Sequence, residues 1–229
     1  MQALSNLALS TLDIIALLWS LLCWFTYTRY VNTSPKSLVS SMYRWRRRWS
    51  LTMLKRDNRI MDAQVITGLN NVVTFFCSTS IFITAGLFAS IGSSEQIVLL
   101  VNQLSFLQAT NIATVELKLG LLIVIFIYSF FKFGWAIKQH SYSAVVLASV
   151  PAAQDVDLER DTPTATLMGK LSSLGAQHFN DGVRGYYFAM ATLSWFVHPL
   201  VYIAVISWVV VVMHRRDFRS KLLQHLSEA

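Results

Sequence analysis

The stretch that decides the fold is "LKLGLLIVIFIYSFFKFGWAI", residues Leu117–Ile137, an apolar block that contains two lysines. A helix of this length covers the roughly 30 Å hydrocarbon core of a bilayer. Three further blocks have similar length and character, at about residues 7–27, 72–91 and 186–213. Hydrophobic residues make up 54% of the 229 and charged residues only 14%, the balance of a membrane protein. The sequence therefore predicts an all-α integral membrane protein with four transmembrane helices in one domain.

The distribution of positive charge predicts how these spans are oriented. Residues 29–59 carry nine Lys or Arg against one acid, whereas residues 90–117 carry no Lys or Arg. Because positive loops are retained in the cytoplasm, we expect a multi-pass protein of the cell inner membrane, with the N-terminus outside and the first loop cytoplasmic. Four crossings would then export the tail "HRRDFRSK", residues 214–221, although its four positive residues favour the cytoplasm. The large positive charge of the first loop favours export of the tail. The side of the membrane on which the tail lies is therefore left as an open alternative.

Two amphipathic helices are expected on the cytoplasmic side, at residues 35–61 and 163–180. Each begins with a capping residue followed by proline, Ser34-Pro35 in the first and Thr162-Pro163 in the second. In the first helix, apolar residues recur at three-, four- or seven-residue steps while basic residues occupy other faces. This pattern predicts binding to anionic lipids, or else packing of the same face on the protein's own helices. The candidate residues for binding the membrane surface are Arg44, Trp45, Arg47, Arg48 and Trp49.

Lys132 lies about 6 residues from the cytoplasmic end of its predicted span, roughly 9 Å deep. Its side chain could reach the lipid headgroups along the neighbouring phenylalanines. Alternatively it belongs to a polar cluster in the cytoplasmic half of the membrane, because intramembrane charges commonly pair and mark solute pathways. We expect Asp62 or the Asn70/Asn71 pair to lie closest to it. The candidate cluster comprises Lys132, Asp62, Asn70, Asn71, Asn180 and Arg184.

His198 lies about 12 residues into the fourth block, which predicts a position near mid-membrane, and Pro199 after it would bend the helix. No other histidine lies inside a predicted span, so no haem or other cofactor is expected. The sequence contains no Gly-rich phosphate loop, zinc-binding motif or nucleophile elbow. We therefore predict no metal site, no catalytic residue and no enzymatic activity. The net charge of +7 is attributed to the membrane surface rather than to nucleic acid.

Several stretches together resemble a known family. They are "RDNRIMDAQVI", "FFCSTSIFITAGLFA", "FIYSFFKFGWAIKQHSY", "HFNDGVRGYYFAMATLSWFVHP" and "HRRDF". Their order and spacing are similar to the membrane-protein family of bacteria and plants called domain of unknown function 599, from about residue 10 to residue 220. The resemblance implies a four-span fold and no known activity. It draws attention to Arg59, Asp62, Lys132, Phe179, Asn180, Arg184 and Tyr186.

Two functions are compatible with this sequence. One is an oligomeric inner-membrane channel or transport component for an ion or small solute. Homo-oligomerisation is expected in that case because four helices alone leave little room for a solute path. The other is a non-catalytic accessory or scaffold subunit of a larger membrane complex, attached to lipids through its basic helix.

Overall fold

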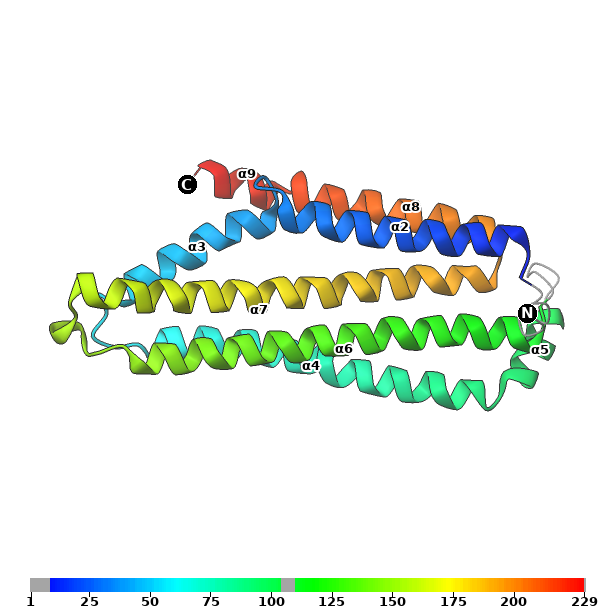
Figure 1. Ribbon diagram of the computed structural model, residues 1–229, viewed down its shortest axis with the longest axis horizontal. Coiled ribbons are helices and arrows are strands. Elements are labelled where there is room, and N and C mark those ends of the chain that lie inside the picture. The colour runs from blue at the N-terminus through cyan, green and yellow to red at the C-terminus, as the bar shows by residue number, and fades with distance from the viewer. Residues whose placement is uncertain (1–8, 104–109, 229) are drawn as a thin grey trace. The chain divides into compact units, whose positions relative to one another are not determined.

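The computed structural model describes residues 9–103 and 110–228, where all regular secondary structure is helical (Figure 1). The helices are α2 (Thr11–Thr33), α3 (Leu38–Met53), α4 (Ile60–Ile91), α5 (Ser94–Gln103), α6 (Ile112–Ser149), α7 (Leu158–Thr192), α8 (Pro199–Phe218) and α9 (Lys221–Glu228), with short 3₁₀ helices η1 (Ala153–Asp155) and η2 (Leu193–Phe196). Four stretches are long and apolar enough to cross a membrane: Thr11–Met53, Ile60–Ile91, Ile112–Ser149 and Pro199–Leu226. The predicted all-α membrane fold is confirmed.

The chain divides into two compact units, each assembled from separate segments. The first unit comprises Met1–Tyr30, Thr79–Ser129 and Val183–Arg216, and the second comprises Val31–Ser78, Phe130–Gly182 and Asp217–Ala229. Helices α2, α4, α6, α7 and α8 contribute residues to both units, whereas α3 and α9 belong wholly to the second.

Buried residues of α6 recur at alternating steps of three and four along the helix. This spacing is typical of two helices that pack side by side in a shallow supercoil. The buried series is Val115, Leu119, Leu122, Phe126, Ser129, Phe133, Ala136, His140, Ser143 and Leu147. Helix α6 continues well beyond the predicted span 117–137 and ends only at Ser149.

Glycines of α7 face this buried series of α6 at close range. A Cβ added to Gly182 would lie 2.6 Å from Phe133 Cε1, and one added to Gly175 would lie 2.8 Å from His140 Cε1, both within the second unit. In the first unit, a Cβ on Gly185 would similarly overlap the hydroxyl group of Ser129. The two helices therefore approach each other where α7 has no side chain.

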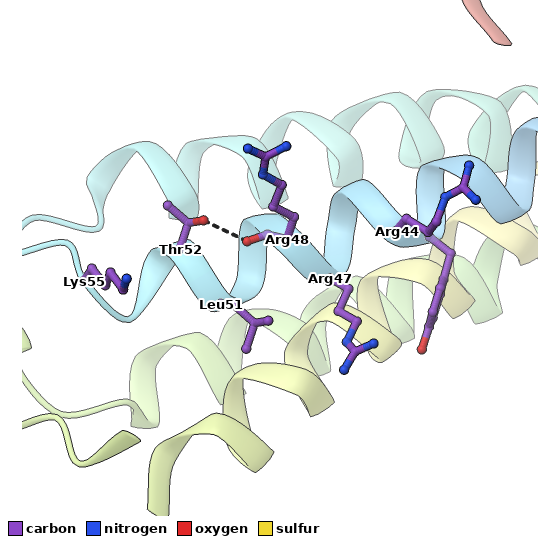
Figure 2. Close-up of a pocket in the computed structure, with 7 residues that line it drawn as sticks. Arg44, Arg47, Arg48, Leu51, Thr52 and Lys55 are labelled. Carbon is purple, nitrogen blue, oxygen red and sulfur yellow. Dashed lines mark hydrogen bonds between the residues drawn. The ribbon is translucent and has the colours of Figure 1, made fainter. Parts of the chain in front are cut away.

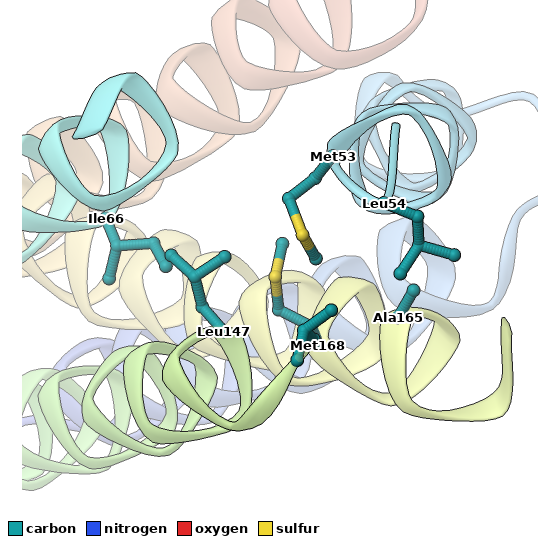
Figure 3. Close-up of a cluster of buried hydrophobic side chains, with 7 residues drawn as sticks. Met53, Leu54, Ile66, Leu147, Ala165 and Met168 are labelled. Carbon is teal, nitrogen blue, oxygen red and sulfur yellow. The ribbon is translucent and has the colours of Figure 1, made fainter. Parts of the chain in front are cut away.

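In the second unit, four helices meet in one hydrophobic cluster, shown in Figure 3. Its buried residues are Met53 and Leu54 at the end of α3, Ile66 of α4, Leu147 of α6, Val150, and Ala165 and Met168 of α7. The side chains of Met53 and Met168 lie against each other in the close-up. This cluster attaches α3 to the α6–α7 pair.

The last predicted span, residues 186–213, does not form one bent helix. Residues 186–192 end α7, η2 follows, and Pro199 begins α8. The His198 ring Nδ1 accepts a hydrogen bond from Leu200 N at 3.1 Å, and proline suits the first helical position because it has no N–H to leave unpaired. His198 and Pro199 therefore start a helix, and the predicted bend is wrong.

Both predicted amphipathic helices have different bounds in the structure. Residues 163–180 are not a separate helix, because they lie inside α7, which begins at Leu158. Asp157 caps that helix, since its carboxylate accepts from Glu159 N at 2.9 Å. The helix expected at 35–61 is α3, residues 38–53. It is capped by Ser37, whose hydroxyl accepts from Ser40 N at 3.3 Å.

We predict that Gly182→Ala destabilises the protein by about 1–3 kcal/mol, because the added methyl group must displace the buried ring of Phe133. Gly134→Ala is the matched control on α6, since nothing lies within 4 Å of an added Cβ there. Alanine at position 134 should raise stability by up to about 1 kcal/mol through helix propensity alone. Thermal unfolding in mild detergent compares the two; equal midpoints would contradict this account of the α6–α7 contact.

Candidate functional site

One face of α3 is fixed to the protein. Ser50 is buried, and a Cβ added to Gly169 of α7 would lie 2.7 Å from its hydroxyl oxygen and 3.3 Å from the Arg46 carbonyl oxygen. Trp49 packs against the hydrophobic cluster, and its indole Nε1 donates a hydrogen bond to Asp62 Oδ1 at 2.6 Å. Trp49, a candidate for membrane binding, is therefore part of the protein's own interior contacts.

The other face of α3 is basic and exposed. Arg44, Arg47 and Arg48 are exposed there, and the half-buried Trp45 lies beneath Arg48, whose guanidinium carbon is 5.1 Å from the ring centroid. A groove of about 500 Å³ runs along this face, and Figure 2 shows Arg47 and Leu51 on one side of α3 and Arg48 and Thr52 on the other. We call this the basic groove; its lining residues are Tyr43, Arg44, Arg47, Arg48, Leu51, Thr52 and Lys55.

No carboxylate lines the basic groove. Arg44 donates a hydrogen bond to the Ser41 hydroxyl at 3.3 Å, which leaves its charge without an acidic partner. A guanidinium group carries coplanar N–H donors that can bind two oxygens of one phosphate or carboxylate group. The groove is therefore suited to an anionic ligand.

Two other arginines of the same segment serve the fold. Arg56 forms an ion pair with the buried carboxylate of Asp62 at the start of α4. Arg59 donates to the carbonyl oxygens of Val150 and Pro151, at 2.7 and 2.6 Å, just beyond the end of α6. These carbonyls follow a helix end, where backbone acceptors lack intrahelical partners. Positive charge in this segment therefore has two roles: Arg56 and Arg59 bind groups of the protein itself, whereas the arginines that line the groove are exposed.

Lys132 forms an ion pair in the second unit. Its ammonium Nζ lies 2.9 Å from Asp181 Oδ2 on α7, and Asn32 Nδ2 of α2 donates to Asp181 Oδ1 at 3.1 Å. The side chain of Asp181 is 4% exposed and that of Lys132 is 25% exposed, so the carboxylate is the more deeply buried partner. The acidic partner of Lys132 is thus Asp181 rather than Asp62, whose described contacts are with Trp49 and Arg56, and the expectation that Asp62 or the Asn70/Asn71 pair lies near Lys132 stays a prediction.

The remaining candidates of the predicted cluster are separated by burial. Asn71 is exposed, Asn180 is half-buried and Arg184 is buried on α7. Asn70 is half-buried, and its Oδ1 atom has no hydrogen-bond partner. No group of three or more His, Cys, Asp or Glu side chains within residues 9–103 and 110–228 is placed to hold a metal ion.

Lys118 is a further buried charge, and the sequence did not indicate it as a site residue. In the first unit, the Lys118 Nζ donates a hydrogen bond to the backbone carbonyl oxygen of Trp195 at 2.9 Å. The same Nζ lies 5.3 Å from the centroid of the Trp195 ring. The Trp195 indole N–H in turn donates to Asp13 Oδ1 at 2.7 Å. Asp13 lies in the first turn of α2, and Lys118 lies in the second turn of α6. The reversal between α7 and α8 is therefore fixed beside the beginnings of α2 and α6.

We predict strong coupling between Lys132 and Asp181. Lys132→Met removes the ammonium group paired with a buried carboxylate and should cost about 3 kcal/mol, whereas Lys132→Met with Asp181→Asn should cost clearly less than the two single changes together. Unfolding midpoints of all variants in one detergent measure the coupling.

Asp62→Asn provides the matched control, because Asp62 is equally buried but has other partners. Its effect should add to that of Lys132→Met. A Lys132→Met protein as stable as the parent would mean that the lysine only extends toward headgroups. Additivity with Asp181→Asn would likewise contradict the ion pair.

Comparison with known proteins gives one result. No curated protein and no solved structure matches the chain. The family described as "Protein of unknown function, DUF599" matches residues 15–222, which is most of the chain. The protein therefore belongs to the DUF599 family.

Proposed function

We propose that this protein is a non-catalytic accessory or scaffold protein of the membrane, which holds the basic groove of α3 against anionic lipid headgroups at the cytoplasmic face. The observation that carries the proposal is the division of α3 into two faces. Ser50 and Met53 are buried against the protein, while Arg44, Arg47 and Arg48 are exposed without a carboxylate in the groove.

The magnitude of the attraction is sufficient for stable contact. Each basic residue close to an anionic membrane surface contributes about 1 kcal/mol, so the four cations of the groove together contribute roughly 4 kcal/mol at low salt. The membrane-spanning helices already hold the protein in the bilayer. The groove therefore needs only to select anionic headgroups over neutral ones. Added salt should weaken this preference because it screens the electrostatic attraction.

The orientation proposed with this function has the N-terminus outside and the first loop in the cytoplasm of a bacterial-type inner membrane. Nine basic residues in positions 29–59 support it. The cytoplasmic leaflet carries the anionic surface potential that such residues favour. In this orientation the basic groove faces the leaflet that attracts it.

We predict that the triple variant Arg44→Gln, Arg47→Gln, Arg48→Gln binds phosphatidylglycerol roughly 100-fold more weakly than the parent at low salt, from three charges at about 1 kcal/mol each. The full-length protein in neutral detergent is titrated with fluorescent phosphatidylglycerol, and with phosphatidylcholine for comparison. The difference between parent and variant should shrink as salt is added.

The matched control is Lys36→Gln, Lys138→Gln, Lys170→Gln, which removes the same charge from three exposed positions of the second unit outside the groove. It should retain most of the binding. Equal weakening by both triple variants would show that net charge alone matters, and unchanged binding in the arginine variant would contradict the proposed function.

An oligomeric channel or transport component is a second candidate. The observation that favours it is the buried Lys132–Asp181 pair with Asn32 attached, since paired charges inside membrane helices often lie on solute pathways. Solute flux through vesicles that changes in Lys132→Met, Asp181→Asn, while the arginine variant leaves flux unchanged, would support this candidate.

A further inference from the structure

Within each unit, the end of α7 lies alongside the third apolar block. The contacts within each unit follow one antiparallel register. In each contacting pair, the residue number on the α7 side falls by about as much as the number on α6 rises. The contacts are Lys118 with Trp195 and Ser129 with Gly185 in the first unit, and Lys132 with Asp181, Phe133 with Gly182 and His140 with Gly175 in the second. Residues 178–195 therefore pair with the predicted span 117–137, and their length of about 27 Å approaches the thickness of the hydrocarbon core.

The exposed side chains of this segment suit a lipid environment. Tyr187, Met190 and Leu193 are 40%, 64% and 47% exposed and recur every three residues, so they form one apolar stripe. The two charged residues in the segment, Asp181 and Arg184, are 3% and 1% exposed. The segment thus presents apolar groups outward and keeps its charges inside the protein.

We propose that the C-terminal half of α7 crosses the membrane as a fifth helix, and that the tail after α8 thereby lies on the same side as α3. Asp181 and Arg184 lower the hydropathy of the segment, since each charge costs about 3 kcal/mol on insertion scales. In the folded protein the pairing of Asp181 with Lys132 offsets that cost. Hydropathy alone therefore misses this crossing.

A fifth crossing changes the side of the membrane that is assigned to the segments after residue 192. The reversal at 193–198 lies beside the first turn of α2 and the second turn of α6, on the side of the N-terminus. Helix α8 then returns the chain to the side of the first loop. The four positive residues of the tail join the nine of the first loop, in agreement with the charge rule for both segments.

The tail also meets α3 directly, because α9 lies against α3 in the second unit. Arg219 and Lys221 are exposed at the start of this tail. We infer that they extend the basic groove into one surface for anionic lipids, an inference that rests on the proposed function.

Cysteine labelling of the full chain in intact bacterial cells tests the fifth crossing. Single cysteines replace Lys36, Glu95, Val197 and Arg219 in a background where Cys23 and Cys77 are changed to serine. An impermeant maleimide should label positions 95 and 197 from outside, and positions 36 and 219 only after permeabilisation. Labelling of 36 and 219 on opposite sides would overturn the proposal, and Lys221→Cys repeats the measurement if the Arg219 variant fails to accumulate.

Lipid titration tests the shared surface separately. Arg219→Gln, Lys221→Gln should weaken phosphatidylglycerol binding roughly tenfold or more at low salt, while Lys138→Gln, Lys170→Gln should not. If the arginine variant of α3 loses binding and the tail variant keeps it, the shared surface is wrong and the proposed function stands. If neither loses binding, the proposed function fails, and the labelling result alone decides the fifth crossing.

Discussion

The close antiparallel contact of α6 and α7 is the constraint on which the rest of the structure depends. Glycines at 175, 182 and 185 allow the backbone of α7 to approach the side chains of α6 in both units. Several of the polar contacts described above attach to this pair: Asp181 binds Lys132 across it, Arg59 binds the carbonyls that follow α6, and Lys118 holds the reversal that follows α7. Small residues are an effective basis for such a contact in lipid, where hydrophobic burial does not drive helices together and packing must.

The sequence predicted the membrane class and the four apolar blocks that lie in long helices. It did not reveal the end of α7, because Asp181 and Arg184 make that segment look polar when their burial is unknown. The role of Pro199 was wrongly predicted for a related reason. Proline occurs both at a bend inside a helix and at the first position of a helix, and only the contacts of Trp195 distinguish the two cases here. The repeat of α6 was readable in principle from Ser129, His140 and Ser143, polar residues whose positions in an apolar run fit its repeat of alternating three- and four-residue steps.

For the basic segment, the sequence identified the charged helix but could not assign the partners of its charges. Arg56 and Arg59 are as basic as Arg44 and Arg48, yet they bind a carboxylate and two carbonyl groups of the protein itself. Asp62 lies only 6 positions from Arg56, but Val150 lies 91 positions from Arg59, and no local sequence pattern contains that second contact. The same holds for Lys132, whose partner Asp181 lies next to the predicted Asn180 but on a helix whose register was unknown.

The approach of Gly169 to Ser50 has a consequence for how α3 would meet a membrane. Helices that fold only on the bilayer lose conformational entropy as they bind and bury their apolar face there, which gives association a large negative heat-capacity change. Helix α3 is already folded, and Met53 is already buried against α7 and α6. Its association with headgroups would therefore need no ordering step and should show a heat-capacity change near zero, with ionic strength as the main control on its affinity.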